Sequence, residues 1–261
     1  MTDIPIVLDS SGIKGAVSHD FTMNLYAPID LHDISHEAAL ISLNLSNTWF
    51  NVTEANGNNL FHYYNGTVWK TLTIPDGNYS LQTLNMAIHE GMKENGDVTI
   101  DGVTGVETYN INISPQIGTL KVKIEVKNSY KVDLSIGNIR NLLGFDAIEV
   151  SATQVGPSNA DITNGVNELH LHCSLINAGM YKNASTSDII HSFVPAGQVG
   201  ASLNFRNDNP LYIAIRDSRY IDSIRMYVTD QLGRSVNLNG SPLTATIHIR
   251  PRTMLRGDSR R

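Results

Sequence analysis

The stretch HEAALISLNLSNTWFNV, residues 36–52, sets the pattern for the fold. Its central residues alternate between two faces, one with Leu40, Ser42 and Asn44 and the other with Ile41, Leu43 and Leu45. A repeat of two residues is the pattern of a β-strand that turns one face to a core and the other to solvent. We therefore predict a long strand here, with Trp49 packed into the core at its end.

Short alternating runs of the same kind recur on both sides of a central region. Two lie early in the chain, near 19–28 and 36–50. Six more follow, near 167–176, 188–194, 199–205, 210–216, 219–229 and 234–250. Two plus six gives eight, the strand number of a jelly roll. The fold class that we predict is all-β dominated, an eight-stranded single jelly-roll β-sandwich with an insertion.

The region between these two groups breaks the two-residue period twice. After Ser80, a possible N-cap, apolar residues recur at helical spacing, namely Leu81, Leu84, Ile88 and Met92. In LSIGNIRNLLGF, a second helix follows Ser135, and Gly144 is suited to its C-terminal end. Because β-type runs lie between the two helices, we predict an inserted α/β domain that carries two short helices.

These signals divide the chain into three parts. Residues 1–50 and 166–250 form a discontinuous jelly-roll domain, residues 51–165 form the insertion domain, and residues 251–261 form a basic C-terminal tail. The segment 151–167, rich in small and polar residues, is the linker that returns to the sandwich. The alternative is two sequential domains that meet near residue 155.

The charge balance suits a protein that packs against other subunits. The chain carries a formal net charge of −6, and only 17% of its residues are charged. Its polar surface therefore comes largely from Asn, Ser, Thr and Gly, which cost less to bury at an interface than charges do. An ordinary β-protein with polar loops would have the same composition.

The compartment is indicated by the cysteine content and by the first residues. Cys173 is the single cysteine and has no intrachain partner, which fits intracellular production. The opening MTDIPIVLDS lacks the basic and apolar regions of a signal peptide. No apolar run approaches the roughly 18 residues of a membrane span. We therefore expect neither secretion by a signal peptide nor a membrane span.

A search for catalytic chemistry finds no recognisable pattern. The chain has no nucleophile elbow, phosphate-binding loop or dinucleotide fingerprint before a helix, so we predict no enzyme, no cofactor and no metal. His170 and His172 share one strand face and could bind a metal, but a zinc site needs further ligands. We interpret them as half-exposed strand histidines. Three acidic residues lack the spacing of a calcium loop and indicate a polar turn, Asp97, Asp101 and Glu107.

Aromatic residues near a predicted hairpin carry more information. HYYNGTVWK places Tyr63, Tyr64 and Trp69 within a few residues of one another. Aromatic side chains of this kind anchor subunit interfaces, and they equally fill cores and corners. We keep all three as candidate interface residues.

Several stretches, taken together and in order, resemble a known family. They are FTMNLYAPIDL, EAALISLNLSNTWFNV, IPDGNYS, LSIGNIRNLLGF, LHLHCSLI, DQLGRSV and LTATIHIRP. Their order over about residues 5–251 is similar to that of the penton, or minor capsid, proteins of virophages, Polinton-like viruses and Maverick/Polinton elements. Each stretch alone is loose, so the resemblance depends on order and spacing.

The resemblance implies a structural virion protein. It implies a single jelly roll with an added domain, present as a homopentamer at each icosahedral five-fold vertex beside double-jelly-roll major capsid proteins. It also implies a capsid location, contacts with other minor capsid or spike proteins, no catalysis and no cofactor.

The tail RPRTMLRGDSRR raises a separate question. Its arginines form a basic patch on an acidic protein that suits contact with capsid proteins or packaged DNA, namely Arg250, Arg252, Arg256, Arg260 and Arg261. The tripeptide Arg256, Gly257 and Asp258 could bind a cell-surface receptor. A solvated, disordered end is the third alternative.

Two other functions remain open at this point. A receptor- or glycan-binding β-sandwich, such as a spike or fibre head, would use Tyr63, Tyr64 and Trp69 on its surface. A metal-dependent enzyme would use His170 and His172.

Overall fold

A computed structural model describes residues 3–13, 17–32, 34–163, 166–176, 180–182, 185–197, 199–216 and 219–252. The chain is mostly β, and its contacts divide it into two compact units. The first unit combines Met1–Trp49 with Val166–Arg261, and the second is Phe50–Gly165. Among the described residues, no helix is long and apolar enough to cross a membrane.

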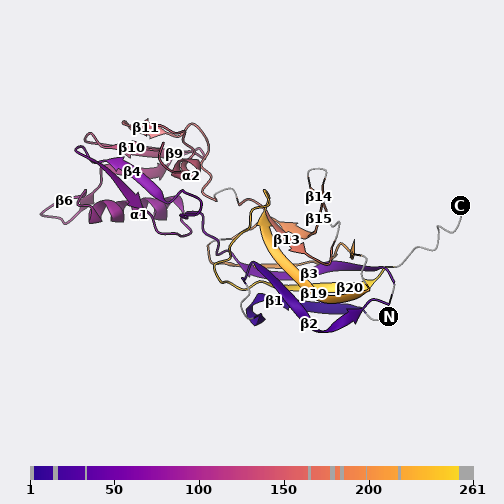
Figure 1. Ribbon diagram of the computed structural model, residues 1–261. Helices are drawn as coiled ribbons and strands as arrows, with labels where there is room; N and C mark the ends of the chain where they lie inside the picture. The colour runs from indigo at the N-terminus through magenta and orange to yellow at the C-terminus, as the bar shows by residue number, and fades with distance from the viewer. Residues whose placement is uncertain are drawn as a thin grey trace. The chain divides into compact units, whose positions relative to one another are not determined.

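Two antiparallel sheets build the first unit (Figure 1). One has the order β1-β20-β3-β17, with the short β18 also paired to β3, and the other has the order β16-β13-β19-β2. Their strands are β1 Ile4–Asp9, β2 Asp20–Asp30, β3 His36–Ser46, β13 Leu169–Cys173, β16 Ile189–Phe193, β17 Ser202–Arg206, β18 Ile213–Ala214, β19 Tyr220–Asp230 and β20 Thr244–Pro251. A 3₁₀ turn at Ser10–Gly12 follows β1, and a small hairpin pairs β14 Met180–Lys182 with β15 Ser185–Ser187.

The strands from the beginning of the chain pair with strands from its end. β1 pairs with β20, β2 pairs with β19, and β3 lies between β20 and β17. Figure 1 shows this directly, because the indigo strands β1, β2 and β3 lie among the yellow strands β19 and β20. The first unit therefore forms only when its two sequence segments meet.

One apolar core lies between the two sheets. Leu8, Leu43 and Ile247 come from the first sheet, Leu171 and Ile224 come from the second, and all five are buried in one cluster. Apolar side chains from both sheets thus share a core, which is the arrangement of a β-sandwich. The predicted core position of Trp49 is confirmed, because its side chain is buried in the same cluster.

A β-bulge changes the predicted faces of β3. The register with β20 shifts between Thr246 and Ile247, which pair with Ser42 and Leu40, so Ile41 is the extra residue. A bulge reverses the alternation beyond it. Leu40 is therefore buried in the core beside Leu43, while Ile41 is only half-buried. The prediction that placed Ile41 on the same face as Leu43, and Leu40 on the other, is wrong.

The strand boundaries also differ from the prediction at both ends of the chain. The sequence pattern did not predict β1. The run near 210–216 shortens to β18, which pairs with β3 on the same edge as β17. The run near 234–250 contains a strand only from Thr244 onward. Turn residues such as Asn237 and Gly240 explain the last difference, because they interrupt pairing before β20 begins.

The second unit contains three small sheets and two helices. The sheets have the orders β11-β10-β4-β5, β12-β9-β8 and β6-β7. The elements are β4 Leu60–Tyr64, β5 Trp69–Thr73, α1 Leu81–Glu94, β6 Thr99–Ile100, β7 Glu107–Thr108, β8 Ile111–Pro115, β9 Val122–Val126, β10 Lys131–Asp133, α2 Ile139–Leu143, β11 Glu149–Val150 and β12 Gln154–Val155. They surround a core of their own.

Helix α1 follows the sequence prediction. Ser80 caps its N-terminus, since its Oγ accepts a hydrogen bond from the Thr83 amide over 3.2 Å. Its apolar stripe, Leu84, Ile88 and Met92, is fully buried in the core of the second unit. Periodic apolar residues therefore place both the helix and its buried face.

Helix α2 ends at a glycine that the fold requires. Gly144 adopts a left-handed conformation with φ 70°. A Cβ atom at this position would lie 2.5 Å from the Ser158 carbonyl oxygen and 2.7 Å from that of Asn159. Both the backbone angle and the available space therefore favour glycine at the end of the helix.

We predict that Gly144→Ala lowers the free energy of unfolding by about 3 kcal/mol or more, because left-handed strain adds to a backbone clash. Gly96→Ala is the matched control. Gly96 has φ 75°, and a Cβ atom there would meet no other atom within 4 Å, so only the strain of about 1 kcal/mol applies. Urea unfolding measures both variants. Equal losses would show that the close approach at Gly144 is not a constraint.

Candidate functional site

A row of contacting polar side chains crosses the outer face of the β16-β13-β19-β2 sheet. Arg225 on β19 donates two hydrogen bonds to Asp20 on β2, over 2.8 and 2.6 Å. Its guanidinium also lies 4.8 Å from the centre of the Tyr227 ring. That ring stacks on His172 of β13 at 4.2 Å, and the Tyr227 hydroxyl donates to Asp188, just before β16. These contacts connect strands across the sheet and fix their register.

The two strand histidines are buried, so the prediction that they are half-exposed is wrong. His170 is 5% exposed and His172 is 8% exposed. Both ring nitrogens of His172 are engaged, Nδ1 with Asp188 at 2.6 Å and Nε2 with the Thr229 hydroxyl at 2.9 Å. Among the described residues, no group of three or more His, Cys, Asp or Glu side chains could hold a metal ion. Both ring nitrogens of His172 are thus used in contacts within the sheet.

The order Thr229, His172, Asp188 has the hydroxyl, imidazole and carboxylate of a nucleophilic triad. Here the hydroxyl belongs to a buried threonine, and the Tyr227 ring covers the imidazole. The neighbouring Cys173 is fully buried, and burial raises the pKa of its thiol to about 12. The contacts of Thr229, His172 and Asp188 join β19, β13 and the start of β16.

The structure separates the three candidate aromatic residues. Tyr63 is fully buried in the second unit, so the prediction that it contacts a partner is wrong. Tyr64 and Trp69 lie on paired strands with ring centres 5.4 Å apart, and Trp69 also stacks on His62 at 4.9 Å. Trp69 remains 40% exposed. The interface role of Tyr64 and Trp69 stays a prediction.

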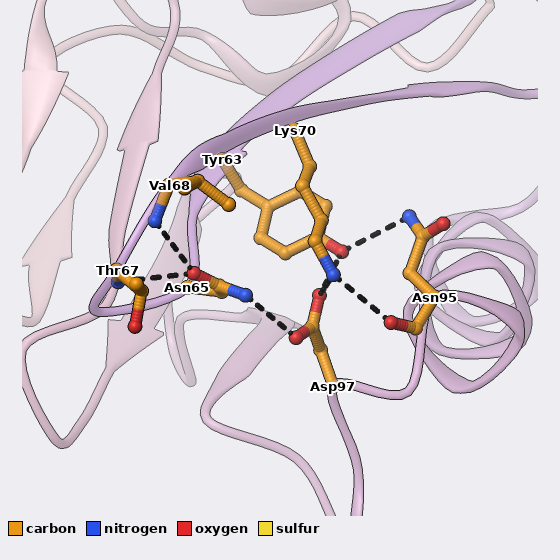
Figure 2. A network of polar contacts seen from close by, with 7 residues as sticks. All are labelled: Tyr63, Asn65, Thr67, Val68, Lys70, Asn95 and Asp97. Atoms are coloured by element: carbon orange, nitrogen blue, oxygen red, sulfur yellow. Dashed lines mark hydrogen bonds and ion pairs between the residues drawn. The ribbon is translucent and has the colours of Figure 1, made fainter.

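Tyr63 belongs instead to a buried polar network around Asp97 (Figure 2). The Tyr63 hydroxyl donates to Asp97 Oδ2 over 2.5 Å, and Lys70 Nζ lies 2.8 Å from the same oxygen. Asn65 Nδ2 donates to Oδ1 over 2.9 Å. Lys70 also donates to the carbonyl oxygen of Asn95 at the end of α1, over 2.9 Å. The network joins β4, β5 and the end of the helix.

The negative charge of Asp97 is compensated by its partners in this network. Burial by itself would raise the pKa of Asp97, but hydrogen bonds from Lys70, Tyr63 and Asn65 hold it below its usual value. Burial, followed by the bond to Asp97, raises the pKa of the Tyr63 hydroxyl well above its usual value. Asp97 is thus an ionised anchor of the fold. The predicted polar turn is wrong for Asp97, whereas Asp101 does accept turn hydrogen bonds from Val103 and Thr104.

Arg250, the first arginine of the basic end, belongs to strand β20. Its Nε donates to Glu37 on β3 over 2.7 Å, and its guanidinium lies 3.4 Å from the centre of the Tyr212 ring. The amide of Arg252 donates to the Ser35 carbonyl oxygen over 2.8 Å. A partner contact by these two arginines stays a prediction. The remaining candidates lie outside the described residues, namely Arg256, Gly257, Asp258, Arg260 and Arg261.

Comparisons with known proteins give structural neighbours only. No protein-family model and no curated protein matches the chain. The crystal structure of the mavirus penton protein matches with a TM-score of 0.51 and 10% sequence identity, over 96% of this chain and 99% of that one. This chain shares the fold of that penton protein. Because the match covers nearly the whole of both chains, it extends over both units.

A second neighbour comes from the cryo-EM structure of the Sputnik virophage. It matches with a TM-score of 0.41 and 13% identity, over 96% of this chain and 97% of that one. The similarity is too low to support a conclusion about the fold.

Sequence patterns did not reveal the residues that hold these networks. Asp188 and Thr229 lie far from His172 in the sequence, and they meet it only through strand pairing. Asp97 follows α1 in a segment rich in polar residues, where a buried carboxylate has no distinguishing pattern. One feature could have pointed to the Asp97 network, namely the predicted hairpin, which pairs Tyr63 directly with Lys70.

We predict that Asp97→Ala lowers the free energy of unfolding by about 2–4 kcal/mol at pH 7, because it leaves Lys70, Tyr63 and Asn65 without their shared partner. The range allows for the partial exposure of Lys70. Asp101→Ala is the matched control on an exposed turn, with an expected loss below about 1 kcal/mol. Denaturant unfolding measures both.

The contribution of Asp97 to the stability of the fold depends on pH in a defined direction. The folded-state pKa of Asp97 is lowered, so its contribution is present above the unfolded value of about 4 and is lost as the pH falls through the folded value. The difference in stability between the wild type and Asp97→Ala should therefore shrink below about pH 4. A difference that grows with acidity would contradict the ionised network.

Proposed function

We propose that the chain is a structural subunit of a virion capsid, a penton protein that forms homopentamers at the five-fold vertices. The observation that carries the proposal is the likeness to the mavirus penton protein over 96% of the chain. The described polar clusters support it, because their side chains are engaged in holding strands together. In this proposal the protein acts through its shape and its contacts.

The sandwich is, in this proposal, a jelly roll interrupted by an inserted domain. Two sheets with four strands each along their main paths, in the orders β1-β20-β3-β17 and β16-β13-β19-β2, support the eight-stranded jelly roll. Residues 1–50 and 166–250 would be this capsid domain. Residues 51–165, with their own core, would be the insertion domain.

A ring of five copies requires a heterologous interface, in which one surface of each copy meets a different surface of the next. A single contact of modest strength then repeats around the ring, and closure makes the assembly stable. Free sheet edges suit this role, because contact with a neighbour protects them from uncontrolled pairing. Edge strands β2 and β16 at the two ends of one sheet provide such surfaces.

The partners in this proposal are other copies of the chain, double-jelly-roll major capsid proteins, and other minor capsid or spike proteins at the vertex. The location is the virion, after synthesis inside the host cell. The basic tail would contact neighbouring capsid proteins or the packaged genome, since its arginines complement acidic surfaces and phosphates.

We predict that the purified chain forms pentamers at micromolar concentration, alone or after co-expression with its major capsid protein. Native mass spectrometry counts the copies directly. A chain that stays monomeric under both conditions, or one that forms trimers, would contradict the proposal.

A glycan- or receptor-binding sandwich is the second candidate, because Trp69 is exposed and stacked beside Tyr64 and His62. Exposed aromatic stacks of this kind can bind the apolar face of a ligand. Saturable binding on a glycan array that Trp69→Ala abolishes would favour this function. Leu120→Ala changes another exposed apolar residue of the second unit and is the control.

A further inference from the structure

The end strand β16 carries a histidine on the face that turns toward the core. His191 pairs directly with Leu171 of β13, and residues directly opposite each other in an antiparallel pair share one face of the sheet. Leu171 is fully buried in the core between the two sheets. A titratable ring therefore lies at the margin of this apolar core.

Two phenylalanine rings enclose the His191 imidazole. Its centre lies 4.1 Å from that of the Phe205 ring on β17 and 6.0 Å from that of the Phe193 ring on its own strand. Both phenylalanines pack against the core. Because β16 and β17 belong to different sheets, the His191 ring is a contact between the edges of the two sheets.

The surroundings of the His191 ring suit its neutral form. Its Nε2 atom is buried and has no hydrogen-bond partner among the described residues. Burial lowers the pKa of His191 below its usual value. An added proton would place a positive charge against hydrocarbon and aromatic groups, which costs free energy unless the charge is paired.

The charged and titratable groups of the elements packed against β16 do not supply such a partner in the part of the chain that the structure describes. They are Glu168, His170 and His172 at β13, Asp188 before β16, Arg206 and Asp208 at β17, and His36 and Glu37 at the start of β3. His170 and His172 alternate with the core residues of β13, and Asp188 is bound to His172 on the outer face. Glu37 is bound to Arg250.

β16 is also weakly held by its backbone. It is an end strand of five residues, and in the described sheet it pairs with β13 alone. A register shift between Leu171 and His172 interrupts this pairing. The segment that follows contains Gly197 and Gly200, both with positive φ. A strand with so few backbone bonds can open locally without unfolding the rest of a domain.

We propose that proton uptake by His191 releases the end strand β16 from the sandwich, while the other described strands stay paired. The neutral ring holds β16 against Phe205, and the charged ring leaves this contact for water. The inference concerns the sandwich itself and does not depend on the proposed function.

The direction of the pH dependence follows from the burial of the ring. Since the pKa of His191 in the folded state lies below the unfolded value of about 6.5, the contact is fully stable above that pH. It is weakened as the pH falls from there through the folded value. Carboxylates titrate near pH 4, so their effect is small above pH 5.

The native cysteine reports the release of β16. Cys173 is fully buried on β13, and its amide donates a hydrogen bond to the Asp188 carbonyl oxygen over 3.0 Å. The start of β16 therefore lies beside Cys173, and its release should expose the thiol. The reagent 4,4′-dithiodipyridine reacts with thiols in mildly acidic and in neutral solution, so it measures this exposure at both pH 7.5 and pH 5.5.

His191→Phe keeps an aromatic ring and removes the titration. The labelling rate of the wild type, divided by that of His191→Phe at the same pH, should rise about 3- to 10-fold between pH 7.5 and pH 5.5, as expected for one proton taken up below pH 6.5. The division removes the effect of pH on the thiol. His191→Gln, a smaller neutral replacement, should give the same trend.

The exposed His32 provides the matched control, and His32→Asn should respond to pH like the wild type. A ratio that stays constant between the two pH values would overturn the proposal. A ratio that falls in acid would also overturn it, because the phenylalanine rings would then stabilise the charged imidazole.

Hydrogen–deuterium exchange locates the opening. This is needed because His19, beside β2, also has a buried ring nitrogen without a described partner and could make the whole fold acid-sensitive. The difference between the wild type and His191→Phe at pH 5.5 should be confined to peptides that cover β16. A difference spread over both sheets would show global unfolding and would overturn the release of β16 alone.

Discussion

The pairing of β3 with β20 is the interaction on which the first unit depends. It extends from Asn44 and Thr244 to His36 and Pro251, so it joins the beginning of the chain to its end. β1 and β2 are bound in the same way, to β20 and β19. The sandwich core therefore cannot close until both sequence segments are present, which makes its folding slow relative to that of locally paired proteins.

This constraint explains how the chain accommodates a second unit between β3 and β13. The entropy cost of closing a loop grows only slowly with its length, so a long segment between β3 and β13 costs the sandwich little free energy. The residues of the second unit are organised by their own core and by the Asp97 network. Each unit thus has its own source of stability, and the second unit does not interrupt the strand order of the sandwich.

Local signals in the sequence predicted the local parts of the structure. Ser80 and the periodic leucine, isoleucine and methionine residues predicted α1, because a helix is determined by neighbours within a few residues. The bulge at Ile41 could not be predicted, because it depends on the partner strand β20. For the same reason, the burial of Tyr63, the contacts of His172 and the position of His191 beside Phe205 became visible only in the structure.

In the proposed function, the chain builds a shell vertex through its shape. A cryo-EM reconstruction of particles that contain it tests this claim most directly. The predicted result is five copies around each five-fold axis. Copies located away from the five-fold axes, or particles whose vertices lack this chain, would contradict the proposal.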